Sequence, residues 1–284
     1  MSAIKELIDQ HHPSTLEETK SALREVLQGL VLAGLSRGGF FSKASFYGGT
    51  ALRIFYGLNR YSEDLDFTLK KQDDSFSLEP YLGHITELAS SYGIALETSI
   101  KKKKNPTPIE SAFAKANTYS TFLNLKLSDE FASLLHKDET IKVKFEVDCA
   151  PSLGFDSEVR WIDDPEFASV SVLDEPSLFA GKLHAVLCRN YKNNVKGRDY
   201  YDFLFYMKKK VSPNLAYLRN KLIETGKIKE GEEFNIDVLK KMLTERFETV
   251  DFAKAKEDAK KFLYSNESLD YFTKELFIDM ARRL

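Results

Sequence analysis

Two aspartates separated by a single residue are the first feature of the sequence that could carry chemistry. In residues 64–69, even-numbered positions are polar and odd-numbered positions are apolar. Successive side chains of a strand point to opposite faces, so the pattern predicts a half-buried strand with Asp64, Asp66 and Thr68 facing away from the core. Adjacent carboxylates repel each other unless a cation lies between them, and their hard oxygen atoms suit Mg²⁺. The alternative is an acidic surface strand without a metal.

A second acidic strand is predicted over residues 141–149, where apolar and charged residues alternate. Glu146 and Asp148 share its polar face. If this strand lies in the same sheet, one of the two could join Asp64 and Asp66. Three carboxylates could then hold the two metal ions of an in-line phosphoryl transfer. The alternative is the charged face of an amphipathic strand, and the choice between Glu146 and Asp148 stays open.

A pair of glycines precedes the first aspartates. Gly48, Gly49 and Thr50 lie between a short predicted strand, residues 46–47, and a predicted helix, residues 50–57. Glycine lets a backbone approach a phosphate closely, and a helix N-terminus attracts negative charge. A simple turn is the alternative interpretation, because glycine is common in turns.

A lysine and two aspartates occur later in the chain, in predicted helices. Lys182 lies in an unusually apolar stretch, from which its ammonium group could reach a triphosphate. Asp199 and Asp202 are three residues apart and therefore share a helix face. The alternative for Asp202 is a surface ion pair with Arg198. Two further residues in this region, His184 and Cys188, are interpreted as core residues.

These residues require elements to position them. A helix is predicted over residues 14–37, with Ser14 and Glu17 as a capping box and Gly38-Gly39 at its end. Strands are also predicted over 94–100, 119–127 and 169–173, and a helix over 78–92. The remaining predicted helices are 178–191, 199–210, 214–225, 236–247, 252–264 and 269–283. The sequence thus predicts a mixed α/β part followed by a helical part, divided into residues 1–168 and 169–284.

Composition narrows the class of protein. The 284 residues are 43% hydrophobic and 30% charged, as in an ordinary globular protein. No apolar run approaches the roughly 20 residues that span a bilayer, and the N-terminal residues do not resemble a signal peptide. With only Cys149 and Cys188 present, we expect reduced thiols and a cytoplasmic location.

Charge argues against a globally basic nucleic-acid-binding protein, because the net charge is −2. Two lysine runs, residues 101–104 and 208–210, stand out locally. They are interpreted as a solvated loop and a helix C-terminus, with a contact strip for a polyanion such as RNA as the alternative.

The order of these motifs is more specific than any one of them. Gly-Gly-Thr followed by Asp-Leu-Asp-Phe and an acidic strand resembles the nucleotidyltransferase superfamily that includes DNA polymerase beta. Three segments resemble the AbiEii/AbiGii-type nucleotidyltransferase toxins of type IV toxin–antitoxin and abortive-infection systems: FYGGTALRIFYGLNRYSEDLDFTL, AGKLHAVLCRN and KGRDYYDF. The resemblance covers about residues 46–206.

The resemblance implies a polymerase-beta-like core with a mixed sheet, followed by a helical domain that contributes Lys182 and Asp199. It implies that Gly48, Gly49 and Thr50 bind phosphates and that Asp64 and Asp66 bind Mg²⁺ or Mn²⁺. The remaining implied roles are nucleotide contact for Lys182, activation of the acceptor for Asp199, and nucleotide binding for Asp202, its neighbour in the motif. It also implies a cognate antitoxin.

Three functional hypotheses follow. The first is a toxin that transfers a nucleoside monophosphate from an NTP to RNA, with tRNA as the expected acceptor, and so inhibits translation. The second keeps the chemistry but makes the acceptor a protein or a small molecule, which the net charge of −2 mildly favours. The third is a nucleotide-binding partner protein without catalysis, which the complete set of motifs disfavours.

Overall fold

The computed structural model describes residues 3–101, 107–189, 195–264 and 269–284. These residues form two compact units, each described below by itself. The first unit comprises residues 1–47, 63–151 and 158–172, and the second comprises residues 48–62, 152–157 and 173–284.

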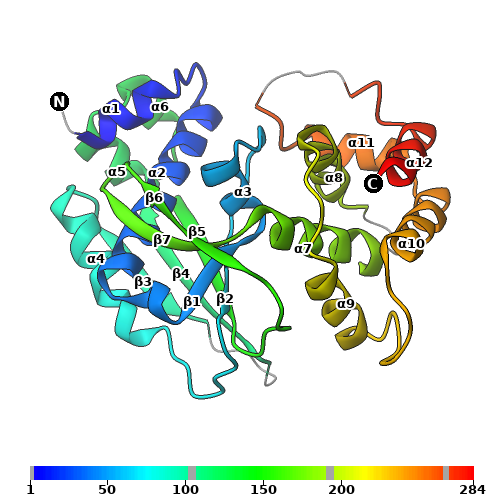
Figure 1. The fold of residues 1–284 in the computed structure, drawn as a ribbon. Helices are drawn as coiled ribbons and strands as arrows, with labels where there is room; N and C mark the ends of the chain where they lie inside the picture. The colour runs from blue at the N-terminus through cyan, green and yellow to red at the C-terminus, as the bar shows by residue number, and fades with distance from the viewer. Residues whose placement is uncertain (1–2, 102–106, 190–194, 265–268) are drawn as a thin grey trace. The chain divides into compact units, whose positions relative to one another are not determined.

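The first unit is built on a seven-stranded mixed sheet with strand order β3-β4-β5-β2-β1-β7-β6 (Figure 1). Pairs β1–β2, β3–β4 and β4–β5 are antiparallel, whereas β2–β5 and β1–β7 are parallel. The strands are β1 Ala44–Tyr47, β2 Leu65–Leu69, β3 Leu96–Ile100, β4 Ile109–Asn117, β5 Thr140–Asp148, β6 Ser157–Ile162 and β7 Ala168–Leu173.

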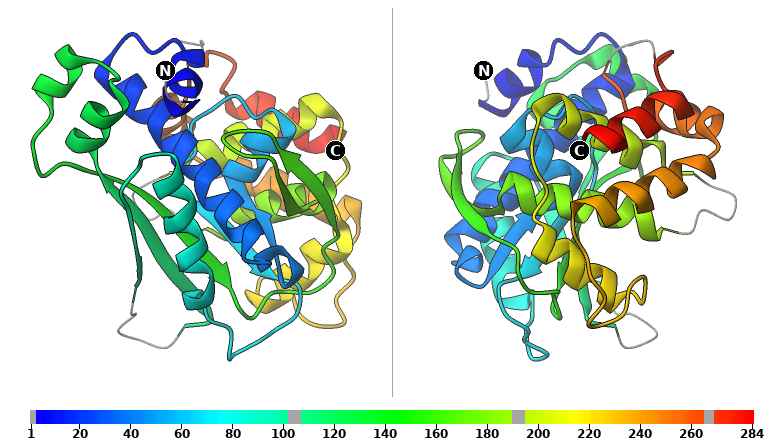
Figure 2. Two further views of the ribbon diagram at one scale, coloured as in Figure 1. Left: turned by 90° about the vertical axis from the view of Figure 1, so that its left-hand side faces the viewer. Right: turned by 45° about the vertical axis from the view of Figure 1, so that its right-hand side comes forward.

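Two helices cover one face of this sheet. Helices α2 (Leu16–Arg37) and α4 (Glu79–Ser91) lie side by side there (Figures 1 and 2). The sheet contributes apolar residues in register, with Phe46 opposite Phe67, and Phe67 opposite Val147. All three are fully buried, and the Phe40 ring packs edge-on against Phe67 with 5.0 Å between ring centroids. This apolar layer fixes the register, because a one-residue slip would bury the acidic face instead.

The N-terminal cap of α2 lies one residue later than predicted. Thr15, rather than Ser14, is the N-cap residue, and its side chain accepts a hydrogen bond from the Glu18 backbone N–H. The Glu18 carboxylate in turn accepts from the backbone N–H of Thr15, which completes the capping box. Ser14 still contributes, since its hydroxyl donates to the same carboxylate at 2.7 Å. The helix ends at Gly38, as predicted.

The predicted strand over residues 119–127 is wrong. Those residues form helix α5 (Thr118–Leu125), and the Asn117 side chain caps it by accepting from the Ser120 backbone N–H. The strand in this region is β4, which precedes the helix. Its buried face carries small residues, Ala112, Ala114 and Ala116, which have low strand propensity and left this strand unpredicted. Strand β6 was also not predicted.

The second unit is helical. Its core is an aromatic cluster in which Phe277 contacts Phe203, Phe247 and Phe252, with ring centroids 4.6 to 5.9 Å apart. Such pairs contribute about 0.5–1.5 kcal/mol each beyond the area they bury. The helices are α3 Gly48–Tyr56, α7 Glu175–Cys188, α8 Gly197–Lys209, α9 Leu215–Glu224, α10 Ile236–Glu248, α11 Phe252–Lys260 and α12 Lys274–Arg283.

Most predicted helices of this unit are found, with shifted ends. Helix α7 begins earlier than predicted because Asp174 caps it by accepting from the Ser177 backbone N–H. Helix α12 begins five residues later than predicted, at Lys274, with Thr273 as its N-cap. The second unit also includes α3, which the predicted division assigns to residues 1–168. The boundary between functional domains therefore stays a prediction.

The remaining short elements of the first unit are α1 (Ala3–Gln10), the 3₁₀ turn Phe40–Ser42 and α6 (Asp129–Leu134). Within the part of the chain that the structure describes, no helix has both the length and the apolar composition needed to cross a membrane.

Candidate active site

Neighbouring strands β2 and β5 carry carboxylates predicted from the sequence on one face of the sheet. Asp66 on β2 pairs with Glu146 on β5, and both are half-buried. The strands are parallel, so the paired side chains project from the same face of the sheet. Asp64 immediately precedes β2, and its charge, like that of Asp66, acts on the ammonium group of Lys144. The predicted pairing of the two acidic strands is therefore present.

Register distinguishes the two candidates for the third carboxylate. Glu146 lies directly opposite Asp66, whereas Asp148 lies opposite Thr68, two residues further along β2. Asp148 also accepts a hydrogen bond from the Ala150 backbone N–H at 3.1 Å, at the end of its strand. On this geometry, Glu146 is the better placed neighbour of Asp66.

Ser111 and Lys144 are polar partners of Glu146 on its own face of the sheet. The Ser111 hydroxyl on β4 donates to Glu146 Oε1 at 2.7 Å, and Lys144 Nζ lies 2.6 Å from Oε2. Burial lowers the pKa of Lys144, but the hydrogen bond to Glu146 and the charges of Asp64 and Asp66 outweigh burial and raise it. Lys144 therefore stays positively charged and offsets part of the acidic charge.

The donor chemistry of this face fits a hard divalent cation. Mg²⁺ is commonly bound by one or two carboxylates, with substrate phosphates and water as its other ligands. Asp64 and Asp66 can supply that protein share. Among residues 3–101, 107–189, 195–264 and 269–284, no three His, Cys, Asp or Glu side chains lie close enough together to hold a metal ion. The predicted three-carboxylate set is thus not assembled around one point in this structure.

Thr68 does not face solvent, contrary to the prediction. It is 2% exposed, and its register partner Ser45 is fully buried as well. Sequence alternation separates the two faces of a strand correctly, but it does not reveal whether the polar face is also covered.

The start of α3 carries the predicted glycine motif. Gly48 begins the helix with φ +86°, a left-handed conformation that glycine adopts without strain. Gly49 allows a close approach, because a Cβ atom there would lie 2.8 Å from Ser62 Oγ and 2.9 Å from Arg60 Nη2. Thr50 follows and is fully buried. The first turn of α3 thus combines a helix N-terminus, which attracts negative charge, with an adjacent cation.

A buried ionic cluster joins three segments of the second unit. Asp202 is fully buried, and Arg60, 2% exposed, donates two hydrogen bonds to its carboxylate, each 2.7 Å long. Lys182 Nζ lies 2.6 Å from Oδ2 of the same carboxylate. Burial raises the pKa of Asp202, but the two cations outweigh burial and hold it below its ordinary value. Both predicted residues, Lys182 and Asp202, therefore belong to one cluster.

Arg60 was not among the residues predicted from the sequence. It lies in the loop between α3 and β2, where an arginine is ordinarily taken for a solvated side chain. Its place two residues before Ser62-Glu63-Asp64 was the available signal, since that run leads directly into the acidic strand. Lys144 was also missed, although its position two residues before Glu146 puts it on the same strand face.

Asp199 is a second buried carboxylate of this unit, and its negative charge acts on Arg60. It lies in the first turn of α8, is 2% exposed, and accepts a hydrogen bond from Arg189 Nη1 at 2.7 Å. Arg189 is the C-cap residue of α7 and is 54% exposed. Asp199 is therefore a buried carboxylate that a largely exposed arginine contacts.

Several alternative interpretations are decided by contacts in the second unit. The surface pair of Arg198 with Asp202 is wrong, because Asp202 is buried and the Arg198 guanidinium lies over the Phe262 ring, 4.6 Å from its centroid. His184 and Cys188 are half-buried, and both contact the Thr225 hydroxyl. Burial lowers the pKa of His184 to about 4, so this ring is neutral at pH 7.

Of the two lysine runs, one lies at a helix end and the other lies mostly outside the described residues. Residues 208–210 end helix α8, with Lys210 as the C-cap, as predicted for a helix C-terminus. In the other run, residues 102–104 lie outside the described residues.

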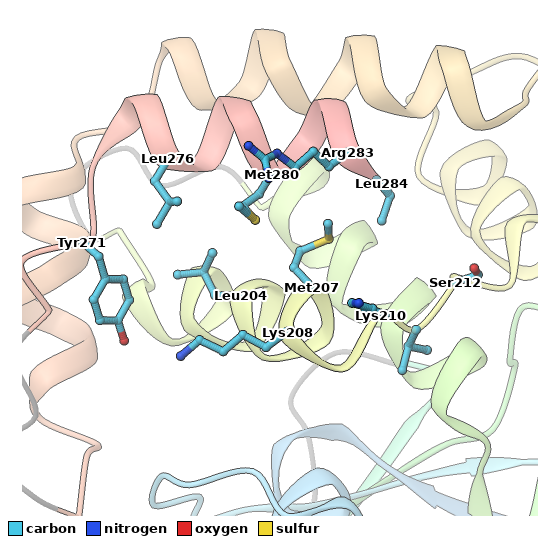
Figure 3. Close-up of a pocket in the computed structure, with 11 residues that line it drawn as sticks. Leu204, Met207, Lys208, Lys210, Ser212, Tyr271, Leu276, Met280, Arg283 and Leu284 are labelled. Atoms are coloured by element: carbon cyan, nitrogen blue, oxygen red, sulfur yellow. The ribbon is translucent and has the colours of Figure 1, made fainter.

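A separate pocket of about 600 Å³ lies between α8 and α12 (Figure 3). Apolar side chains from both helices point into it, including Leu204, Met207, Leu276 and Met280. The pocket contains none of the predicted site residues, so it is distinct from the groups described above.

Comparison with known proteins identifies the family. The family described as "Nucleotidyl transferase AbiEii toxin, Type IV TA system" matches residues 30–274. A crystal structure of a proposed nucleotidyltransferase from H. pylori is similar, with a TM-score of 0.52, 21% identity and 93% of each chain covered. JHP933 from Helicobacter pylori has a TM-score of 0.51 and 20% identity, with 90% of this chain and 88% of that chain covered.

At these identities the two solved structures show a shared fold. No curated protein sequence matches the chain. The family match covers most of the chain and extends well beyond the resemblance over residues 46–206. The chain therefore belongs to the AbiEii family of nucleotidyltransferase toxins from type IV toxin–antitoxin systems.

Proposed function

We propose that this nucleotidyltransferase transfers a nucleoside monophosphate from an NTP to RNA, that tRNA is the acceptor, and that the modification inhibits translation. The observation that carries the proposal is the acidic face of the first unit, on which Asp66 lies opposite Glu146 with Asp64 beside them. Carboxylates on neighbouring strands are what metal-dependent phosphoryl transfer needs.

The proposal assigns a divalent metal, Mg²⁺ or Mn²⁺, to Asp64 and Asp66, with Glu146 as the third carboxylate and Asp148 as the less well placed candidate. When bound, the metal would neutralise negative charge on the triphosphate. Lys144 keeps Glu146 oriented, since its ammonium group holds one carboxylate oxygen and Ser111 holds the other.

Binding of the NTP phosphates is assigned to the start of α3 and to the buried ionic cluster. Gly48, Gly49 and Thr50 offer backbone N–H groups, and Lys182 offers a point charge. Asp202 contributes to nucleotide binding through Lys182, whose ammonium group it holds at 2.6 Å.

We assign Asp199 the role of activating the acceptor hydroxyl group. The acceptor hydroxyl oxygen attacks the α-phosphorus, a new phosphodiester bond forms, and the bond to the departing pyrophosphate breaks. The hydroxyl proton passes to a carboxylate, for which Asp199 is the candidate. Arg189 holds Asp199 Oδ2 at 2.7 Å and so orients the carboxylate.

Two alternatives lead to different outcomes. If the acceptor is a protein or a small molecule, label from the NTP appears there while tRNA stays unmodified. A nucleotide-binding protein without turnover would bind NTP but release no pyrophosphate, and membership of a nucleotidyltransferase family argues against it.

The family implies an antitoxin partner. An RNA acceptor also places the proposed reaction in the cytoplasm, where tRNA is used.

The test is incubation with Mg²⁺, total tRNA and each α-labelled NTP in turn, with Asp66→Asn as the matched inactive variant. The proposal predicts labelled tRNA and released pyrophosphate with at least one NTP, and neither with Asp66→Asn. Label on protein alone would support a protein acceptor instead of tRNA. No label on any acceptor would contradict the proposed nucleotidyl transfer.

A further inference from the structure

The buried ionic cluster of the second unit contains more positive than negative side chains. Arg60 and Lys182 both contact the Asp202 carboxylate, and the three side chains are 2%, 14% and 0% exposed. Two cations therefore share one buried carboxylate. Paired on its own with Asp202, Lys182 would form a neutral unit, whereas the added guanidinium leaves the cluster with an excess positive charge.

Arg60 is held in place from three directions. Its Nε and Nη2 atoms donate to the two oxygens of Asp202, a bidentate geometry that fixes the carboxylate plane. Its Nη1 atom donates to the Tyr61 carbonyl at 2.9 Å. Its Nη2 atom also lies beside Gly49, at the start of α3, where a Cβ atom would be only 2.9 Å away.

Lys182 has no comparable rigidity of its own. A lysine side chain is a flexible four-carbon stem that ends in a point charge. One oxygen of Asp202, Oδ2, holds its ammonium group at 2.6 Å, and Arg60 Nη2 holds the same oxygen at 2.7 Å. The position of Lys182 Nζ therefore depends on how Arg60 orients Asp202.

We propose that Arg60 is a positioning residue for nucleotide binding, which acts through Asp202 to place the ammonium group of Lys182 and to keep the cluster positively charged toward the NTP phosphates. This inference rests on the proposed function in one respect, the contact of Lys182 with the nucleotide. The competing explanation is that Arg60 only stabilises the fold, as buried ion pairs often require both partners.

A double-mutant cycle on NTP affinity separates the two explanations, because coupled residues are non-additive. Arg60→Lys keeps the charge but loses the bidentate geometry. NTP affinity is measured for four proteins: wild type, Arg60→Lys, Lys182→Met and the double variant. The measurement is calorimetry with Mg²⁺ and NTP, at a temperature where every variant is folded. Arg37→Lys is the matched control, because Arg37 makes a bidentate pair with Glu166 at an exposed site of the first unit.

The expected result is that Arg60→Lys weakens NTP binding about 10-fold in the wild-type background, the equivalent of one typical coupling energy. The same change should cost less than about 2-fold when Lys182 is already Met, since the partner through which Arg60 acts is gone. Arg37→Lys should leave the affinity unchanged.

Equal losses in both backgrounds, or no loss in Arg60→Lys, would overturn the proposal. If Arg60→Lys does not fold, Asp202→Glu takes its place in the cycle, because it keeps the charge and displaces the carboxylate that Lys182 contacts. A wild-type protein that binds no NTP contradicts the nucleotide site and this inference together. NTP binding without labelled RNA contradicts only the acceptor.

Discussion

Asp66 lies where β2 and β5 bring two carboxylates into register, half-buried and opposite Glu146. Asp66→Asn keeps the shape of the side chain and removes its charge. We expect nucleotidyl transfer to fall at least about 100-fold, because roughly 3 kcal/mol of electrostatic stabilisation is lost in the transition state. Initial rates of pyrophosphate release measure this loss. The control Asp138→Asn, at a 92% exposed side chain, should retain full activity, and equal rates for Asp66→Asn and wild type would contradict the assignment.

Asp202 provides a prediction about stability. Asp202→Asn leaves Arg60 and Lys182 buried without their counter-ion, and such losses typically cost about 3–5 kcal/mol of unfolding free energy. Urea denaturation at pH 7 measures the cost. A loss below about 1 kcal/mol would show that the cluster is not a closed ionic unit.

The same residue predicts a pH dependence. The folded-state pKa of Asp202 lies below its ordinary value of 3.8, so its contribution to stability is complete above that pH and is lost as the pH falls through the folded-state pKa. The difference in unfolding free energy between wild type and Asp202→Asn should therefore be constant from pH 5 to 7. It should shrink below about pH 4. A difference that instead grew on acidification would contradict the charged state of Asp202.

His184 differs from Asp202 because its folded-state side chain is neutral rather than charged at pH 7. Its pKa falls from 6.5 to about 4 on folding, so the unfolded chain binds the proton more readily between these values. Stability that depends on the neutral ring is complete above pH 6.5 and is lost as the pH falls toward 4. Wild-type protein should lose more stability than His184→Gln between pH 7 and pH 5, as measured by urea denaturation at each pH. Parallel pH profiles for the two proteins would argue against the shift.

At the scale of elements, the start of α3 depends on the absence of a side chain at Gly49. A Cβ atom would lie 2.8 Å from Ser62 Oγ and 2.9 Å from Arg60 Nη2, closer than real Cβ atoms approach their neighbours. Gly49→Ala should therefore lower the free energy of unfolding by about 1–3 kcal/mol and weaken NTP binding. The control is Gly83→Ala in α4, where a Cβ meets nothing within 4 Å. That change should be neutral or stabilise by up to about 1 kcal/mol. Equal stability of the two variants would contradict the close approach.

The elements that the sequence predicted well are those with strong periodicity. The alternation in 64–69 and 141–149 corresponds to β2 and β5 within a residue or two, because one face of each strand is fully apolar. Residues 119–127 misled the prediction, since their apolar side chains fit either a strand or a helix, and Asn117 as an N-cap decides for the helix. Strand β4 was missed because its buried face is formed by alanines.

The candidate site was predictable where residues carry their chemistry in a local pattern. Asp64, Asp66, Gly48 and Gly49 stand in short motifs, and Lys182 is conspicuous in an apolar helix. The partners of these residues were not predictable. Arg60 contacts a residue 142 positions away, and the Ser111 contact with Glu146 spans 35 residues, so both depend on tertiary structure that local patterns do not encode.

At the scale of the whole molecule, the chain has two compact units with different chemistry. The first unit carries the acidic face of β2 and β5, and the second carries the start of α3, the cluster around Asp202, and Asp199. A net charge of −2 gives little general attraction to RNA, so recognition of an RNA acceptor would have to rely on local groups. The small net charge also predicts little non-specific binding of the protein to RNA, so a labelling assay should report the true acceptor.

The most direct test of the central claim is transfer of α-labelled nucleotide to purified tRNA in the presence of Mg²⁺, followed by gel separation of RNA and protein. The account predicts label on tRNA with the wild-type protein, and loss of that label with Asp66→Asn or after removal of the metal by EDTA. Unlabelled tRNA with every NTP, or labelling that persists in Asp66→Asn, would contradict it.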